Sequence, residues 1–408
     1  MPIFTGNEDG RPVSLSGQET IYNRNIMYDK LVSIEATSLT PAIRKENRDE
    51  FLREMIPFHS FSSRPSMPPI ARTTSPQGDQ LAGGSIQGSV LLPDGRVFII
   101  SRGGNYSLVY NPIKDTWKQI PHDTSTSGNL IFIGGIPLPD GRVFMTPLGS
   151  ASGRRPSFFD YRTDTITAGS PGLDVWRTGS IHYGACLAPD GRVVSVGAPV
   201  GSNFFGVWNL KNDTYTEYYA PEGMEFGNSL GIGLASDGTI WGNGRSGNVY
   251  PIFDWKNNTA DGMFTDRPSG GYTNPANMLD GNLICPSFYD KAMITVINPI
   301  DRIIVKEVPA PIAVEHPRTL PDGRVIFSAR GGYYAAIYDP TDDSLTYLSG
   351  ENVPNFVSVA FRGCTLLPNG EVFLASTTQA AHMRSVILDF QGLEIGRGYL
   401  THPRNNNS

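Results

Sequence analysis

The chain has 408 residues, a net charge of −6 and three cysteines. Because the charges are spread evenly, no stretch is basic enough to indicate a nucleic-acid partner, and no apolar run approaches the roughly 18 residues needed to cross a membrane. The odd number of cysteines, far apart in the sequence, argues against a disulfide framework and favours a reducing compartment.

Residues 1–83 do not share the repeats that fill the rest of the chain. They begin without the basic start and apolar core of a signal peptide, so we expect the protein in the cytoplasm or in a virion. Residues 41–55 are predicted to form one short helix, and residues 62–80 a linker stiffened by prolines. We expect an extended arm that folds onto a neighbour, and the alternative is a partly disordered tail.

One face of the predicted helix carries three large apolar side chains, Ile43, Phe51 and Met55. We expect these side chains to pack against another subunit or against the rim of the folded domain. The arm would then dock the protein into an assembly.

A tight-turn motif recurs seven times between residues 84 and 401. The sequence Leu-Pro-Asp-Gly-Arg-Val-Phe occurs unchanged at 92–98 and 138–144, and looser copies follow at steps of 42 to 50 residues. The Asp-Gly or Asn-Gly pairs begin at Asp94, Asp140, Asp190, Asp237, Asp280, Asp322 and Asn369. A repeat of this length, built around a turn, predicts a radial array of small sheets.

A second turn marker, Asn or Asp, follows each pair after 17 to 20 residues, at Asn111, Asp160, Asn209, Asp254, Asn298, Asp339 and Asp389. Such side chains start turns by bonding to the backbone two residues ahead. The two markers divide each unit into four short strands. We therefore predict an all-β, seven-bladed β-propeller over residues 84–401, followed by a polar tail at 402–408.

Seven complete units leave no spare strand at either end of the ring. We expect the ring to close through side-chain packing between blades 1 and 7, unless the arm supplies an extra strand. This seam would be the weakest part of the disc and would gain most from a partner that clamps it. We therefore expect the seam, with the arm nearby, to be an assembly contact.

The repeats resemble bacterial kelch repeats. Unit 6 matches well, with Leu320-Pro321-Asp322-Gly323-Arg324-Val325, then Arg330-Gly331-Gly332, then Tyr338-Asp339-Pro340. Units 4, 5 and 7 depart from the pattern because they lack the Gly-Gly pair. The resemblance implies the propeller fold and says little about activity, since kelch propellers include both binding modules and oxidases.

Few ionisable residues fall near the strands predicted to be innermost. The channel-mouth candidates are His182, Glu225, Glu315 and His316. Glu225 and Glu315 could serve as the acid and base of a glycosidase. The alternative, which we favour, is that they are solvated residues at the channel mouth.

A copper radical oxidase is a further alternative, with His182, Tyr183, Cys186 and His316 as candidate ligands. His182 and Tyr183 are adjacent on a predicted strand, however, and so face opposite ways. Recurrent arginines such as Arg96 and Arg192 follow the repeat and indicate a structural role. We therefore assign no catalytic, cofactor-binding or metal-binding residues and expect no cofactor.

Together these features favour a non-enzymatic docking subunit of a large, symmetric assembly. By architecture alone the chain resembles propeller proteins of bacteriophage tails or virions. Its predicted partners are other protein subunits, reached through residues 1–83 and the seam between blades 1 and 7. The alternatives are a glycan-binding or glycan-processing propeller and a kelch adaptor inside a cell.

Overall fold

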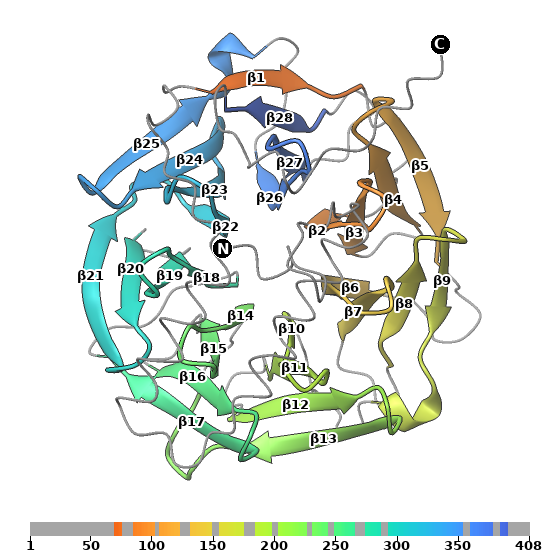
Figure 1. The fold of residues 1–408 in the computed structure, drawn as a ribbon, viewed down its shortest axis with the longest axis vertical. Helices are drawn as coiled ribbons and strands as arrows, with labels where there is room; N and C mark the ends of the chain where they lie inside the picture. The colour runs from red at the N-terminus through yellow and green to blue at the C-terminus, as the bar shows by residue number, and fades with distance from the viewer. Residues whose placement is uncertain are drawn as a thin grey trace, which may run out of the picture.

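The computed structural model describes most of the chain from residue 69 to residue 390. The described ranges are 69–75, 85–102, 106–122, 131–148, 155–174, 184–197, 203–226, 231–243, 249–265, 274–286, 293–353, 360–377 and 384–390. They form seven antiparallel sheets of four strands each. The sheets stand around a common axis (Figure 1), which confirms the all-β, seven-bladed propeller.

Each blade runs from an inner strand near the axis to an outer strand at the rim (Figure 1). The strands of blades 1 to 3 are β2 (Ser85–Leu91), β3 (Val97–Arg102), β4 (Tyr106–Asn111), β5 (Thr116–Pro121), β6 (Ile131–Pro137), β7 (Val143–Leu148), β8 (Ser157–Asp160), β9 (Thr165–Ala168), β10 (Cys186–Leu187), β11 (Val193–Val196), β12 (Phe204–Asn209) and β13 (Thr214–Tyr219). Those of blades 4 to 6 are β14 (Gly231–Leu234), β15 (Ile240–Asn243), β16 (Val249–Asp254), β17 (Thr259–Phe264), β18 (Ala276–Asn277), β19 (Leu283–Pro286), β20 (Met293–Asn298), β21 (Ile303–Pro309), β22 (Val314–Thr319), β23 (Val325–Ala329), β24 (Tyr333–Asp339) and β25 (Ser344–Ser349). Blade 7 contains β26 (Phe361–Leu366), β27 (Val372–Ser376), β28 (Val386–Asp389) and β1 (Ile70–Thr73), and two short 3-10 helices, η2 (Pro171–Leu173) and η3 (Gly350–Asn352), follow β9 and β25.

The predicted turns join the inner strand to the second strand in all seven blades. In blade 1, Gly95 has a φ of 83°, which glycine adopts without steric cost, and its N–H donates to the Leu92 carbonyl at 3.0 Å. The Asp94 carboxylate accepts from the Arg96 N–H at 3.1 Å. An equivalent side-chain contact recurs in the other six blades. The repeat therefore encodes one local turn seven times.

The apolar core is divided into wedges between neighbouring blades. Its buried side chains form seven clusters, each drawn from two adjacent blades. Between blades 1 and 2 the rings of Phe98 and Phe159 stack with centroids 4.1 Å apart. Since every wedge needs two blades, no blade can bury its apolar faces without both neighbours.

A strand from the N-terminal side of the propeller completes the last blade. β1 pairs antiparallel with β28, from Ile70 opposite Asp389 to Thr73 opposite Val386. This pairing covers a sheet edge that β28 would otherwise leave open. The prediction that side-chain packing alone closes the ring is therefore wrong, and the stated alternative, a strand from the arm, is correct.

The position of β1 also corrects the predicted linker at 62–80 and the start of the propeller at residue 84. In the sequence, the prolines at positions 69 and 76 lie outside the bounds of this strand. The propeller therefore begins inside the segment predicted to be a linker. The helix predicted at 41–55 and the polar tail at 402–408 lie outside the described residues.

The residue after Thr74 fastens the closing strand to blade 1. The Ser75 N–H donates to both carboxylate oxygens of Asp115, at 2.9 and 3.0 Å, and the Trp117 indole N–H donates to the Ser75 carbonyl at 3.1 Å. Asp115 has a φ of 48° and also accepts from the Tyr110 hydroxyl at 2.8 Å. The segment that contains β1 is thus bonded to the first blade as well as to the last.

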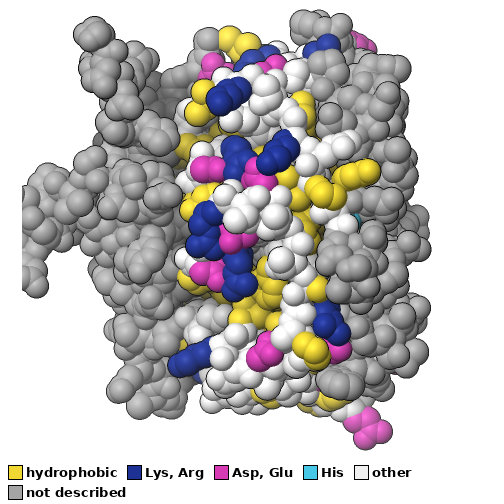
Figure 2. All heavy atoms as spheres, turned by 90° about the vertical axis from the view of Figure 1, so that its right-hand side faces the viewer, with side chains coloured by type: hydrophobic (Ala, Val, Ile, Leu, Met, Phe, Trp, Pro, Cys, Tyr) yellow, Lys and Arg dark blue, Asp and Glu magenta, His cyan; other side chains and the backbone are white. Residues whose placement is uncertain are grey.

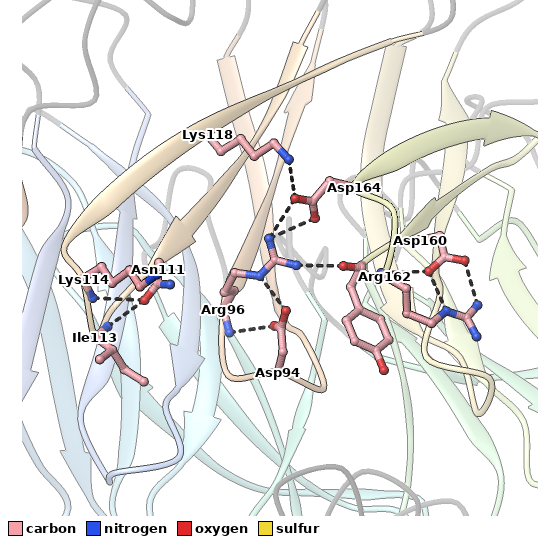
Figure 3. A network of polar contacts seen from close by, with 10 residues as sticks. Asp94, Arg96, Asn111, Ile113, Lys114, Lys118, Asp160, Arg162 and Asp164 are labelled. Atoms are coloured by element: carbon pink, nitrogen blue, oxygen red, sulfur yellow. Dashed lines mark hydrogen bonds and ion pairs between the residues drawn. The ribbon is translucent and has the colours of Figure 1, made fainter. Parts of the chain in front are cut away.

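Arginines that directly precede second strands join neighbouring blades. Arg96 donates to Asp94 of its own turn at 2.6 Å and reaches blade 2, where it donates to Asp164 at 3.0 Å and to the Tyr161 carbonyl at 2.8 Å (Figure 3). Lys118 of β5 adds a 2.5 Å contact to Asp164. The side chain of Arg96 therefore bridges two blades.

Arg192 makes the equivalent bridge from blade 3 to blade 4, where it donates to Asn258 at 2.6 Å and to the Trp255 carbonyl at 2.5 Å. On the face drawn in Figure 2, Lys and Arg side chains lie beside Asp and Glu side chains and not in a patch of one sign. These arginines stabilise the ring, as their recurrence predicts.

We predict that Asp115→Asn destabilises the propeller by about 1–2 kcal/mol, because the neutral amide weakens hydrogen bonds that a carboxylate accepts strongly. Asparagine tolerates the left-handed backbone, so the change tests the contact and not the turn. The control is Asp213→Asn, at the equivalent left-handed position of blade 3 (φ 57°). Equal unfolding free energies for Asp115→Asn and the unchanged protein in urea titrations would contradict a stabilising role for this contact.

Candidate functional site

The inner strand of blade 6 contains a bulge on the side of the disc opposite the Asp-Gly turns. Glu315 pairs with Ser328, and the next pair is Arg318 with Ile326, so His316 and Pro317 stand outside the ladder. His316 has a φ of 52°, a backbone conformation that costs non-glycine residues roughly 1–3 kcal/mol. Similar register shifts occur in the inner strands of blades 1, 2 and 7, so the bulge belongs to the repeat. The positive φ of His316 is the feature that points to function, since backbone strain of this kind is frequent at functional sites.

The register of the repeats shows how unusual this histidine is. The residue six positions before the Asp or Asn of each turn is glycine in five blades, namely Gly88, Gly134, Gly184, Gly231 and Gly363, and it is Asn274 in blade 5 and His316 in blade 6. Gly363 in blade 7 also has a positive φ, of 109°. The other four equivalent glycines are not among those with a positive φ, so His316 shares its unusual backbone with Gly363 alone of this set, and glycine adopts such a backbone more freely than histidine.

Three side chains approach the Glu315 carboxylate from blades 6 and 7. Arg330, which directly follows β23, lies 2.6 Å from Oε1. Arg362 of β26 lies 3.5 Å from Oε2, and His316 Nε2 lies 3.8 Å from the same oxygen. The Glu315 side chain is only 4% exposed, whereas those of Arg330 and Arg362 are about one quarter exposed. We call Glu315, His316, Arg318, Arg330 and Arg362 the Glu315 cluster.

Backbone contacts between the two blades hold the arginines in place. Arg330 forms an isolated antiparallel bridge with Ala360, which precedes β26. The Thr377 N–H and hydroxyl both donate to the Ala360 carbonyl, at 3.0 and 3.1 Å. Arg330 and Arg362 therefore approach Glu315 from backbone segments that are bonded to each other.

Burial and the surrounding charges set the ionisation of the cluster. Burial raises the pKa of Glu315 above its ordinary value, while Arg362 and Arg330 oppose the rise. Burial, followed by the charges of Arg318, Arg362 and Arg330, lowers the pKa of His316 to about 3. The imidazole is therefore neutral near pH 7. The guanidinium groups of Arg330 and Arg362 contact the one carboxylate, and the charge of Arg318 acts on His316. The cluster carries an excess of positive charge.

The structure unites only two of the four channel-mouth candidates, Glu315 and His316. Glu225 is exposed in the connection from β13 to β14, and among the described residues no hydrogen bond or ion pair links it to Glu315. His182 lies outside the described residues, as does Tyr183. The glycosidase pair Glu225 and Glu315 is thus not brought together by any described contact.

Two further hypotheses depend on residues that the structure does not describe. Ile43, Phe51 and Met55 lie outside the described residues, so docking through the arm stays a prediction. For the copper alternative, Cys186 is buried in β10 of blade 3, whereas His316 belongs to blade 6. In the described part of the chain, no group of three or more His, Cys, Asp and Glu side chains is placed to hold a metal ion.

Sequence reasoning missed the contribution of the arginines. In the sequence Arg330 stands out only as part of the repeat step Arg330-Gly331-Gly332, and Arg318 and Arg362 are not singled out. Aligning the units on their turns places Arg362 at the same register as Glu315, seven residues before the turn. Equivalent positions on adjacent inner strands would have pointed to a contact.

Comparison with known proteins finds similar folds but no matching family. No family model and no curated protein matches the sequence, so the kelch and virion resemblances stay predictions. Among solved structures, a streptogramin B lyase has a TM-score of 0.62 at 14% identity and covers 80% of this chain and 99% of its own. Virginiamycin B lyase from Staphylococcus aureus has a TM-score of 0.62 at 14% identity and covers 78% and 99%. Hydrazine synthase from Kuenenia stuttgartiensis has a TM-score of 0.56 at 12% identity and covers 78% and 97%.

These similarities correct one expectation. The prediction of a non-enzymatic docking subunit rested on the arm, the rigid disc and the scarcity of recognisable catalytic motifs. Solved structures with a similar fold include lyases, so the prediction that the protein is not an enzyme is wrong as a conclusion from these features. No helix in the described residues is long and apolar enough to span a membrane.

We predict that the strained histidine makes stability depend on pH between about 7 and 5. Unfolded histidine binds a proton near pH 6.5, whereas folded His316 has a pKa of about 3, so acidification favours the unfolded chain. The loss from this group is about 1–2 kcal/mol at pH 5. His316→Asn keeps a residue that tolerates positive φ and removes the titration.

Urea unfolding at pH 7.5 and 5.0 measures this difference. The raised pKa of Glu315 acts in the opposite sense, because stability from that group falls as pH rises above the unfolded value, and Glu315 is present in both proteins. The pH dependence of the unfolding free energy is therefore compared between the unchanged protein and His316→Asn, and the difference reports mainly on the histidine. An identical pH dependence of the two proteins would show that His316 accepts protons freely in the folded state.

Proposed function

We propose that the protein binds an anionic ligand, or the anionic group of a larger ligand, at the Glu315 cluster. The observation that carries the proposal is the excess of positive charge, because two guanidinium groups contact one buried carboxylate and the charge of a third, Arg318, acts on the adjacent His316. Arginine is favoured for binding carboxylate and phosphate because its planar fork matches two oxygens. Partial burial strengthens that attraction relative to bulk water.

The buried carboxylate supports this proposal as a positioning group. Glu315 contacts Arg330 and Arg362 from two different blades, so it holds two like charges close together before a ligand arrives. Without it, the two guanidinium groups would repel each other. Such preorganisation lowers the free energy that a ligand must supply to order the site.

A second candidate function is catalysis of proton transfer at the same site. It is favoured by the strained His316 beside a glutamate whose pKa burial raises, and by the lyases among the similar folds. A carboxylate with a raised pKa is a better proton acceptor near neutral pH, and a neutral imidazole can donate a hydrogen bond to a developing negative charge.

Anion binding can be tested by calorimetric titration of the full chain with inorganic phosphate and with acetate at low ionic strength. We predict that Arg362→Gln weakens binding by about tenfold or more, which corresponds to about 1.4 kcal/mol for a charge-assisted contact. The matched control is Arg162→Gln, which removes the same charge from the rim, where Arg162 pairs with Asp160. Equal losses in both variants, or no binding by the unchanged protein, would refute the proposal.

The catalytic candidate makes a separate prediction for His316→Gly. Glycine relieves the backbone strain, so the melting temperature of this variant should equal or exceed that of the unchanged protein. If His316 takes part in turnover of an anionic substrate, the same variant should lose activity while it still binds phosphate. Full activity in His316→Gly would remove the histidine from the reaction.

A further inference from the structure

Three consecutive apolar side chains are exposed on the outer strand of blade 5. Ile303, Ile304 and Val305 begin β21 and are 52%, 39% and 49% exposed. The other exposed large apolar side chains of the described ranges stand singly in the sequence, as is ordinary on a protein surface. β21 lies at the rim (Figure 1), and in the described part of the chain no strand pairs with its outer edge. We call Ile303, Ile304 and Val305 the β21 patch.

The β21 patch departs from the pattern of the other blades. The first residue of each outer strand lies opposite the Asn or Asp that ends the third strand. Where blade 5 has Ile303, blades 1 to 4 and 6 have an exposed hydroxyl side chain, namely Thr116, Thr165, Thr214, Thr259 and Ser344. The second residue is buried or half-buried in those five blades, whereas Ile304 is exposed. Since five blades fold with a hydroxyl group at the first position, the fold does not require isoleucine there.

Ion pairs hold the charged residues on either side of the patch. Arg302, just before the strand, donates to Asp261 of blade 4 at 2.6 Å, and Lys306 pairs with Asp343 of blade 6 at 2.5 Å. Between them, Val305 stands outside the ladder, because the strand pairs through Ile304 and then Lys306. The flanking charges therefore stabilise the ring, and the apolar residues between them are left to meet a partner.

An exposed sheet edge is normally protected either by polar side chains or by a helix or loop that covers it. The threonine and serine residues of the other outer strands provide the first kind of protection. Blade 5 lacks it at Ile303, Ile304 and Val305, so an exposed edge here would invite pairing with other chains. We therefore expect a further segment to cover the β21 patch.

The N-terminal arm joins the ring at a place from which it can reach this patch. β1 is the outer strand of blade 7, and Ile70 lies opposite Asp389 just as Ile303 lies opposite Asn298. The arm therefore meets the propeller at the register of the patch, with one blade between them. In the extended form that proline favours, residues 56–68 would span roughly 40 Å at about 3.1 Å per residue. This reach is about twice the radius of gyration of a domain of this size, roughly 20 Å.

The arm also contains a segment of suitable chemistry. Residues 41–55 are predicted to form an amphipathic helix, in which Phe51 and Met55 are four residues apart and so share a side. A helix laid along a sheet edge buries its apolar stripe and shields that edge from other strands.

From these observations we infer that residues 41–55 pack against the β21 patch of the same chain, with Phe51 and Met55 on Ile303 and Val305. Of the two partners expected for the arm, the inference selects the rim of the propeller and not another subunit. It does not depend on the proposed anion binding, because blade 5 contributes no residue to the Glu315 cluster.

Amide hydrogen exchange on the full chain tests this contact. Residues 41–55 should be protected in the unchanged protein, and the double variant Ile303→Thr/Val305→Thr should make them exchange about tenfold faster, because it removes the apolar contact. The double change imitates β13 of blade 3, where Thr214 and Thr216 are exposed at the same two places, so the propeller should stay folded. The matched control is Ile113→Thr, which alters an 81% exposed isoleucine of blade 1 and should leave residues 41–55 protected.

A change in the arm tests whether the contact is direct. Phe51→Ala should by itself speed exchange at residues 41–55, and adding it to Ile303→Thr/Val305→Thr should give no further increase, because both changes remove one contact. Effects that multiply would show separate contacts and overturn the inference. Fast exchange in the unchanged protein, full protection in the double variant, or equal acceleration in Ile113→Thr would overturn it as well. Protection that disappears on dilution would assign the patch to the arm of a second copy, and would also overturn the inference.

Discussion

The backbone hydrogen bonds between β1 and β28 close the ring on which the other packing contacts depend. Each wedge of core lies between two blades, so an unclosed ring would leave the apolar faces of blades 1 and 7 in water. Ser75 adds bonds to Asp115 of blade 1 immediately after the strand. Blades 1 and 7 are neighbours in the ring but lie at opposite ends of the repeats in the sequence. Directional hydrogen bonds therefore secure closure at this interface.

The Glu315 cluster depends on this closure because it spans blades 6 and 7. Blade 6 contributes Glu315 and Arg330, and blade 7 contributes Arg362. Blade 7 takes its outer strand from β1, so the position of Arg362 relative to Glu315 is set partly by residues almost 300 positions earlier in the chain. A ligand that bridges the two blades would stabilise the same part of the ring.

Strain and charge coincide at one place in this otherwise regular fold. Most blades have glycine where blade 6 has His316, and the histidine keeps a left-handed backbone. The neighbouring guanidinium groups would repel each other without the buried Glu315. Both features cost stability, and the surrounding sheet tolerates that cost because its ladders and wedges fix the backbone. Local departures from the repeat of this kind are expected at functional sites, whereas the rest of the propeller keeps the regular pattern.

The sequence by itself determined the turns and the number of blades, because Asp94-Gly95 and its equivalents act on residues at most a few positions away. It also indicated Glu315 and His316 as ionisable residues near the axis. Only the tertiary structure decided that β1 completes blade 7 and that Arg330 and Arg362 converge on Glu315. Those contacts join segments distant in sequence, and their formation depends on the curvature of the whole ring, which no local pattern of residues encodes.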